Sequence, residues 1–116
     1  MVNPSESFDP GQSTERIHLV SSAQVDRVAL IGEIDLGNAR ETESALIDAA
    51  SSGRPLTVDL VGLTYLDSQG IAMFFRLAER ARLNGGSLTL ANPQNMVRRV
   101  VQITHLDDAV GIIDDV

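Results

Sequence analysis

The segment YLDSQGI, residues 65 to 71, places an acid, a hydroxyl, an amide and a glycine directly before a run of apolar residues. Two interpretations are open. In the first, this is an ordinary strand-to-helix turn, where Asp67 or Ser68 accepts hydrogen bonds from the free N–H groups of the first helical turn and Gly70 allows close packing. In the second, Ser68 is placed for chemistry, because a phosphate on its hydroxyl lies at the positive end of a helix dipole.

Ser68 does not have the surroundings of a catalytic nucleophile. They do not match G-x-S-x-G, and His105 would have to reach this serine across the fold. All nine basic residues are Arg and Cys is absent, which excludes Schiff bases, the P-loop lysine and thiol nucleophiles. His18 is the only other imidazole, so a histidine-rich metal site is not expected. We therefore expect no enzyme activity, no cofactor and no metal.

The start of the helix after Ser68 has more apolar residues than a core-facing stripe needs. Residues 71 to 75 are all apolar, whereas one helical face takes about three to four residues in seven. The core face is assigned to Ile71, Phe74, Phe75 and Ala78. Ala72 and Met73, with Gln69 and Arg76, are then expected near solvent beside Ser68. Such a patch suits a docked partner, which a phosphate of charge about −1.5 to −2 on Ser68 would displace.

Two acids elsewhere need an explanation. Asp35, in GEIDLGNA, follows a predicted strand, and because parallel strands end at one edge of a sheet, it is expected near Ser68. The alternative is that Asp35 caps the following helix. Asp59, in TVDL, is a charge in a predicted central strand, and the sequence assigns it no role.

The pattern of apolar residues predicts alternating strands and helices. Two antiparallel strands are expected around residues 17–20 and 25–34, with a bend or a strand end at Gly32. Asn38 with Glu41 predicts a capping box at the start of a helix. The segment PLTVDLVGL predicts a strand buried on both faces, and a helix is expected from Ser68 to about Leu83.

A further strand, SLTLA, precedes a helix that is expected to start at Asn92-Pro93, with Val97, Val100 and Val101 inward. A short strand around residues 112–113 ends the chain. The order β-β-α-β-α-β-α-β indicates an α/β fold with a mixed, mainly parallel sheet of about five strands and helices packed against it.

Length and composition indicate a single domain. The chain has 116 residues, of which 43% are hydrophobic, so it can bury one core. Residues 1–14 are expected to be a flexible tail and residues 15–116 the domain. A net charge of −7 and only 3% aromatic residues argue against nucleic-acid and membrane-surface binding. Without an apolar run of about 18 residues or a signal peptide, the protein is expected in the cytoplasm, monomeric when free.

Three segments together resemble the STAS domain family, in particular the small bacterial anti-sigma-factor antagonists. They are GEID, VDLVGLTYLDSQGI and NGGSLTLANPQNMVRRVVQITHLDD, and the resemblance covers roughly residues 15 to 116. It implies the family's mainly parallel sheet. It also implies binding to a cognate anti-sigma factor that is a serine kinase, so that a sigma factor is released. The kinase then phosphorylates the antagonist in the D-S-x-G turn, and a PP2C-type phosphatase resets it.

By position, the resemblance makes Ser68 the phosphoacceptor, lets Asp67 and Gly70 shape its turn, and matches Asp35 to the family's acid near the partner surface. The expected partner-binding residues are therefore Asp35, Asp67, Ser68, Gln69, Gly70, Ala72 and Met73. Gln69 departs from the family, which frequently has Ser or Thr there.

Two other functions stay open at this point. The chain could be a STAS scaffold or transport-system subunit that is never phosphorylated. It could also bind a small molecule or nucleotide, although Gly85-Gly86 follows a helix where a phosphate-binding loop would precede one.

Overall fold

The computed structural model describes residues 7–8, 16–21 and 26–116, with side chains from residue 26 onward. The expected tail over residues 1–14 lies outside these residues, apart from one short strand. The strands are β1 (Ser7–Phe8), β2 (Arg16–Ser21), β3 (Asp26–Ile34), β4 (Pro55–Asp59), β5 (Leu63–Leu66), β6 (Ser87–Ala91) and β7 (Gly111–Ile113). The helices are α1 (Ala39–Ala50), α2 (Ser68–Leu83), α3 (Asn95–Ile103) and the short 3-10 helix η3 (Leu106–Asp108).

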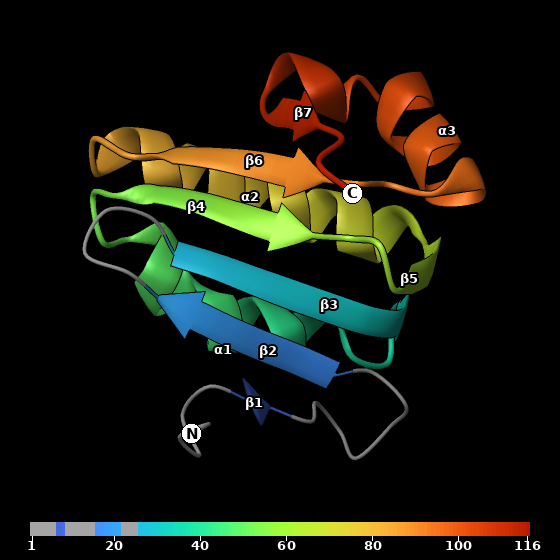
Figure 1. The fold of residues 1–116 in the computed structure, drawn as a ribbon, viewed down its shortest axis with the longest axis horizontal. Coiled ribbons are helices and arrows are strands. Elements are labelled where there is room, and N and C mark those ends of the chain that lie inside the picture. Colours follow the sequence, from blue (N-terminus) through green and yellow to red (C-terminus); the bar gives the residue numbers. More distant parts are fainter. Residues whose placement is uncertain (1–6, 9–15, 22–25) are drawn as a thin grey trace.

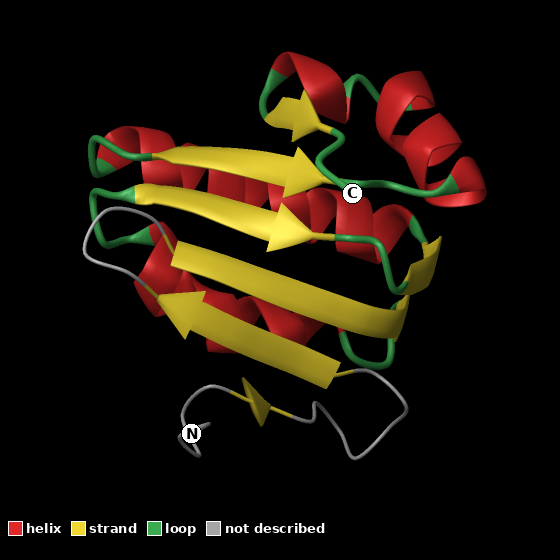
Figure 2. Ribbon diagram, in the orientation of Figure 1, coloured by secondary structure: helices red, strands yellow, loops and turns green. Residues whose placement is uncertain are grey.

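The strands form one mixed sheet in the order β1-β2-β3-β4-β6-β7, with β5 paired to β3 (Figure 1). The pairs β1–β2 and β2–β3 are antiparallel, and the other four pairs are parallel. The predicted hairpin and mainly parallel sheet are confirmed, and the short strands β1 and β5 extend the expected set. Helices α1 and α2 lie side by side on one face of the sheet, and α3 lies past the carboxyl end of β6 (Figure 2).

Strand β4 is buried on one face only. Leu56 and Val58 are fully buried, whereas Thr57 and Asp59, on the other face, are half-buried. The prediction of a strand buried on both faces is wrong because α1 and α2 cover the face of Leu56 and Val58 alone (Figure 2).

Strand β3 has two partners, and Gly32 marks the change. Residues 26–29 pair with β4, and residues 32–34 pair with β5. The register shifts after Gly32, whose φ of 105° is a conformation that glycine adopts without strain. Of the two predicted alternatives at Gly32, the bend is confirmed, whereas the strand does not end there but continues to Ile34. It brings Ile34 opposite Leu66, so the loop after β3 starts beside the end of β5.

Helix α1 begins where the sequence predicts, but without the predicted capping box. Asn38 occupies the N-cap position and makes no side-chain cap hydrogen bond. Its amide instead donates to the carbonyl of Glu33 at 2.9 Å and accepts from the Asp35 N–H at 3.0 Å. Because its side chain folds back onto the preceding loop, Asn38 cannot pair with Glu41 in a capping box.

Helix α3 starts later than predicted. It begins at Asn95, with Gln94 at the N-cap, rather than at Asn92-Pro93, because the Asn92 side chain bonds to Asp59 and Asp115 and does not cap the helix. Val97 and Val101 face the core as expected, while Val100 is half-buried.

Asn92 and Asp59 instead join the last residues of the chain to the sheet. The buried Asn92 amide donates to Asp59 at 3.2 Å and to Asp115 at 2.8 Å, and accepts from the Asp115 N–H at 2.8 Å. Arg27 pairs with Asp59 at 3.1 Å and with Asp115 at 2.9 Å. Burial acts to raise the pKa of Asp59, but hydrogen bonds from the Val61 N–H, Asn92 and Arg27 outweigh it and hold the pKa below its usual value. Asp59 therefore has a structural role.

Candidate functional site

The site is built on the turn from β5 into α2. Asp67 is the N-cap of α2, and one of its carboxylate oxygens accepts from the N–H groups of Gln69 at 2.8 Å and Gly70 at 3.1 Å. Its backbone carbonyl accepts from the N–H of Ile71 at 3.0 Å. The aspartate thus satisfies the N–H groups that a helix start leaves free, and Ser68 is the first residue of the helix. Helix bounds of Ser68–Leu83 confirm the prediction.

Gly70 is required for close packing of this turn. A Cβ atom at this position would lie 2.3 Å from Cδ1 of Leu66 and 3.0 Å from Cγ2 of Ile34. Both of those side chains are buried at the ends of their strands. The start of α2 is therefore held directly against β3 and β5, and Gly70 shapes the turn from beneath, since it is buried itself.

The loop that precedes α1 is hydrogen-bonded to the same turn. The second carboxylate oxygen of Asp67 accepts from the N–H of Leu36 at 3.1 Å, and the N–H of Asp67 donates to the carbonyl of Ile34 at 3.2 Å. Asp35 closes its own loop, where its carboxylate accepts from the Gly37 N–H at 2.8 Å and its carbonyl accepts from the N–H of Ala39 at 2.9 Å. The structure thus brings the Asp35 loop against Asp67, the neighbour of Ser68.

The Ser68 side chain is exposed at this junction. Within the described part of the chain, its hydroxyl makes no hydrogen bond. Asp67 already occupies the N–H groups of Gln69 and Gly70, so a group added to Ser68 would project toward solvent rather than into the helix cap. The hydroxyl is accessible to another protein without any rearrangement of the turn.

The exposed residues of α2 differ from the prediction at two positions. Met73 is 0% exposed and belongs to the core, whereas Phe75, expected in the core, is 38% exposed. The expectation that Met73 lies on the partner surface is wrong. The buried residues of α2 recur at helical spacing and form one stripe, which includes Met73 and leaves out Phe75. They are Gly70, Ile71, Met73, Phe74, Leu77, Ala78 and Ala81. Ala72 is half-buried and Gln69 is exposed, in agreement with their predicted positions.

Sequence reasoning missed Leu36. Its side chain is 76% exposed in the loop bound to Asp67, and it supplies the apolar surface that had been assigned to Met73. A leucine between Asp35 and Gly37, in a loop rather than a strand or helix, was the available signal.

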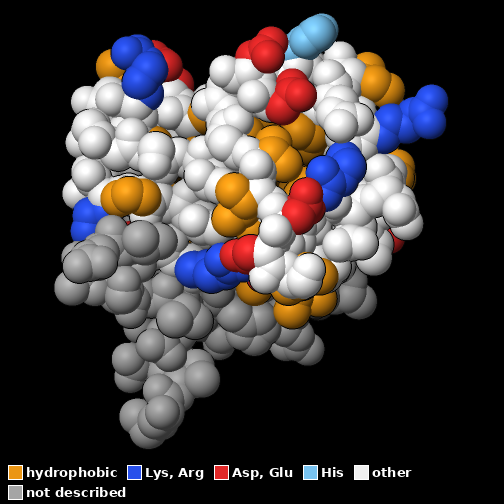
Figure 3. Space-filling model, turned by 45° about the horizontal axis from the view of Figure 1, so that its top comes forward, with side chains coloured by type: hydrophobic (Ala, Val, Ile, Leu, Met, Phe, Trp, Pro, Cys, Tyr) orange, Lys and Arg blue, Asp and Glu red, His pale blue; other side chains and the backbone are white. Residues whose placement is uncertain are grey.

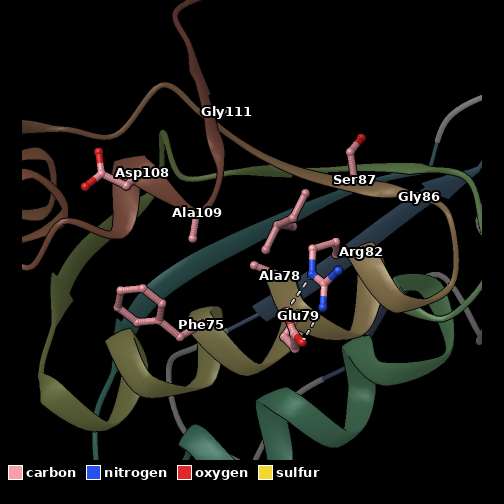
Figure 4. Close-up of a pocket in the computed structure, with 10 residues that line it drawn as sticks. Phe75, Ala78, Glu79, Arg82, Gly86, Ser87, Asp108, Ala109 and Gly111 are labelled. Carbon is pink, nitrogen blue, oxygen red and sulfur yellow. Dashed lines mark hydrogen bonds and ion pairs between the residues drawn. The ribbon is translucent and has the colours of Figure 1, made fainter.

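A hollow of about 560 Å³ lies away from Ser68, between α2 and the segment around η3 and β7. Figure 4 shows Phe75 at one end and the ion pair of Glu79 with Arg82, 2.7 Å apart, on the same helix. Its walls carry no serine near a histidine, and Ser87 stands at its far side (Figure 4).

A surface cluster on η3 offers metal-ligating atoms. His105, Asp107 and Asp108 each offer one such atom, and these three atoms lie within 4.8 Å of one another. All three side chains are exposed. Figure 3 shows acidic and histidine side chains gathered at the surface at the top of the view. Exposed acidic groups of this kind are common without a bound metal, so we assign no metal to this cluster.

Replacement of Asp67 by Ala is expected to lower the free energy of unfolding by about 1 to 2 kcal/mol, because the cap of α2 is lost. Chemical denaturation followed by circular dichroism measures this change. Asp67→Asn should retain most of the cap, and Asp107→Ala, an exposed acid on η3, is the matched control. A loss for Asp67→Ala no larger than that of the control would contradict the cap.

The fold and the site together define a small α/β domain that presents an exposed serine at a helix start, beside a loop from a second helix. The family model described as STAS domain matches residues 20–116. This chain therefore belongs to the STAS domain family, as the resemblance predicted.

Individual proteins support this assignment. The chain is 33% identical over 86 residues to the anti-sigma-B factor antagonist of Bacillus subtilis, covering 74% of this chain and 79% of that protein. It is 29% identical over 85 residues to a STAS-domain containing protein of Pseudomonas aeruginosa, covering 73% and 84%. The crystal structure of an anti-sigma factor antagonist from Mycobacterium paratuberculosis shares the fold, with a TM-score of 0.75 at 20% identity over 97% of this chain and 90% of that one. In the described part of this chain, no helix has the length and apolarity to cross a membrane.

Proposed function

We propose that this protein is an anti-sigma-factor antagonist in the cytoplasm, which binds a cognate anti-sigma factor and thereby frees a sigma factor. The anti-sigma factor is a serine kinase that phosphorylates Ser68, and a PP2C-type phosphatase removes the phosphate. The observation that carries the proposal is the exposed Ser68 hydroxyl at the first position of α2, on a helix cap that Asp67 forms without it. The names of the relatives agree with this role.

The geometry explains how a phosphate on Ser68 would act on a partner and not on the fold. The dipole at the start of α2 favours an anion by about 0.3 to 1 kcal/mol. The carboxylate of Asp67 opposes this gain and keeps the N–H groups of Gln69 and Gly70 occupied. The phosphate therefore remains solvated on the surface. A partner docked over it must desolvate a charge of about −1.5 to −2, which weakens the complex.

Phosphorylation tests the assignment of Ser68. Incubation with the cognate kinase and radiolabelled ATP should add one phosphate per chain to wild type and none to Ser68→Ala. Ser87→Ala is the matched control, because Ser87 is exposed at the amino end of β6 and should not affect labelling. Undiminished labelling of Ser68→Ala rejects the site.

The same experiment addresses the alternative of a constitutive scaffold. If wild type binds its partner but takes up no phosphate under conditions in which the kinase is active on another substrate, the protein acts as an unswitched STAS module.

A further inference from the structure

A second hollow adjoins the Ser68 turn on the side of α1. It has a volume of about 400 Å³ and lies between the first turns of α1 and α2. It is lined by Leu36, Ala39, Arg40, Glu43, Gln69 and Arg76. Because Gln69 directly follows Ser68 and Leu36 is bonded to Asp67, any protein that covers Ser68 from this side also covers the hollow.

One of the two arginines in the hollow is already neutralised. Arg76 pairs with Glu43 across the two helices, with Nε 3.0 Å and 3.1 Å from the two carboxylate oxygens and Nη2 2.6 Å from one of them. Hydrogen bonds to Glu43 raise the pKa of Arg76. This pair forms an electrically neutral wall of the hollow.

Arg40 is the uncompensated charge of the hollow. Its side chain is exposed, and among the residues that the structure describes it has no ion pair. The lining of this hollow carries two arginines and one carboxylate, so the hollow has an excess of one positive charge, whereas the chain as a whole has a net charge of −7. Arg80 and Arg99 are also unpaired in this part of the chain, but neither lines this hollow.

Leu36 supplies an apolar contact next to this charge. At 76% exposure it is among the most exposed large hydrophobic residues of the described chain, and its backbone is fixed by the bond to Asp67. The surface therefore combines an exposed apolar side chain, on a backbone held by a hydrogen bond, with an arginine whose guanidinium can hold a carboxylate bidentately.

We propose that this hollow receives an acidic side chain, Asp or Glu, of the anti-sigma factor, which pairs with Arg40 while an adjacent apolar residue packs on Leu36. The proposal rests on the proposed function, because it places a second contact of the same partner beside Ser68. Charge complementarity selects the occupant, since the free group in the hollow is a cation and its neighbours are already paired.

Titration of the purified anti-sigma factor without nucleotide tests this contact, with wild type, Arg40→Ala and Arg40→Glu compared by isothermal calorimetry. Arg40→Glu is expected to weaken binding by about tenfold or more at low salt, and Arg40→Ala by less, because reversal adds repulsion to the lost pair. The difference should shrink as salt is raised from about 0.05 M to about 0.5 M, since the Debye length falls.

Arg99→Glu is the matched control, because it makes the same change of charge at an exposed, unpaired arginine on α3. It should bind within about twofold of wild type, whereas equal losses at Arg40 and Arg99 would show a general charge effect and overturn the contact. Unchanged binding of Arg40→Glu also overturns it. An effect that appears only with ATP or ADP present overturns it in favour of a phosphate contact.

These outcomes are separable from the proposed function. If wild type binds and Ser68→Glu does not, the proposed function stands whatever Arg40 does. If wild type binds no anti-sigma factor, the proposed function fails and the contact fails with it.

Discussion

A Ser68→Glu variant is expected to bind the cognate anti-sigma factor at least about tenfold more weakly than wild type, a loss of about 1.4 kcal/mol. The reason is local, because the new carboxylate lies at the exposed start of α2 beside that of Asp67, and a docked partner must desolvate both. Calorimetric titration measures the loss, and circular dichroism should show an unchanged fold.

Two variants control this result. Ser68→Ala removes the hydroxyl without adding charge and should bind nearly as well as wild type. Ser87→Glu adds the same charge at the amino end of β6, far along the strands from the turn, and should not weaken binding. If Ser68→Glu binds as tightly as Ser87→Glu, charge at Ser68 does not control the complex and the switch is rejected.

Replacement of Met73 by Ala is expected to lower the free energy of unfolding by about 2 to 5 kcal/mol, because it empties a fully buried position in the core of the sheet and helices. Phe75→Ala, on the same helix two residues later, should cost less than Met73→Ala because Phe75 is 38% exposed. Urea denaturation of the two variants measures the contrast.

Met73→Leu extends the test if Met73→Ala proves too unstable to purify. It conserves volume and should cost less than about 1.5 kcal/mol. Two results would contradict the buried position of Met73: a free energy of unfolding of Met73→Ala equal to that of wild type, or a larger loss of that free energy for Phe75→Ala than for Met73→Ala.

The parts of the fold that could be predicted have strong local signals. The hairpin of β2 and β3 follows from alternating apolar residues, and α2 has a cap at Asp67 and a stop at Asn84 with Gly85, whose φ is 82°. The functional turn belongs to this group. Its cap, its glycine and its serine are contiguous in sequence, so local rules suffice to place them.

The predictions that failed depend on contacts with distant residues. Met73 and Phe75 lie on either side of Phe74 and are both apolar, so the helical period alone does not decide which is buried. Packing of the helix against the sheet determines which of the two side chains is buried. Likewise Asn92-Pro93 has the appearance of a helix start, but Asn92 is held by Asp59 and Asp115, which are 33 and 23 residues away in sequence.

The exposed surface around Ser68, where we propose that the partner binds, could be predicted only in part for the same reason. Ser68, Asp67 and Gln69 lie where expected, but the bond that adds Leu36 to the site joins residues 31 apart in sequence. A hydrogen bond between residues so far apart cannot be predicted from a local sequence pattern. The free charge of Arg40 is equally hidden, because a sequence does not show that Glu43 pairs with Arg76 instead.

The hydrogen bond from Leu36 to Asp67 has a consequence for the entropy and the rate of association. A free loop would have to be ordered when a partner binds, at about 1 to 2 kcal/mol for each residue whose backbone is fixed. Here the loop is fixed to a helix cap before any partner arrives, so much of that loss is already incurred during folding. Complex formation then needs no slow rearrangement of this surface, and a change in affinity at Ser68 should be expressed mainly as faster dissociation.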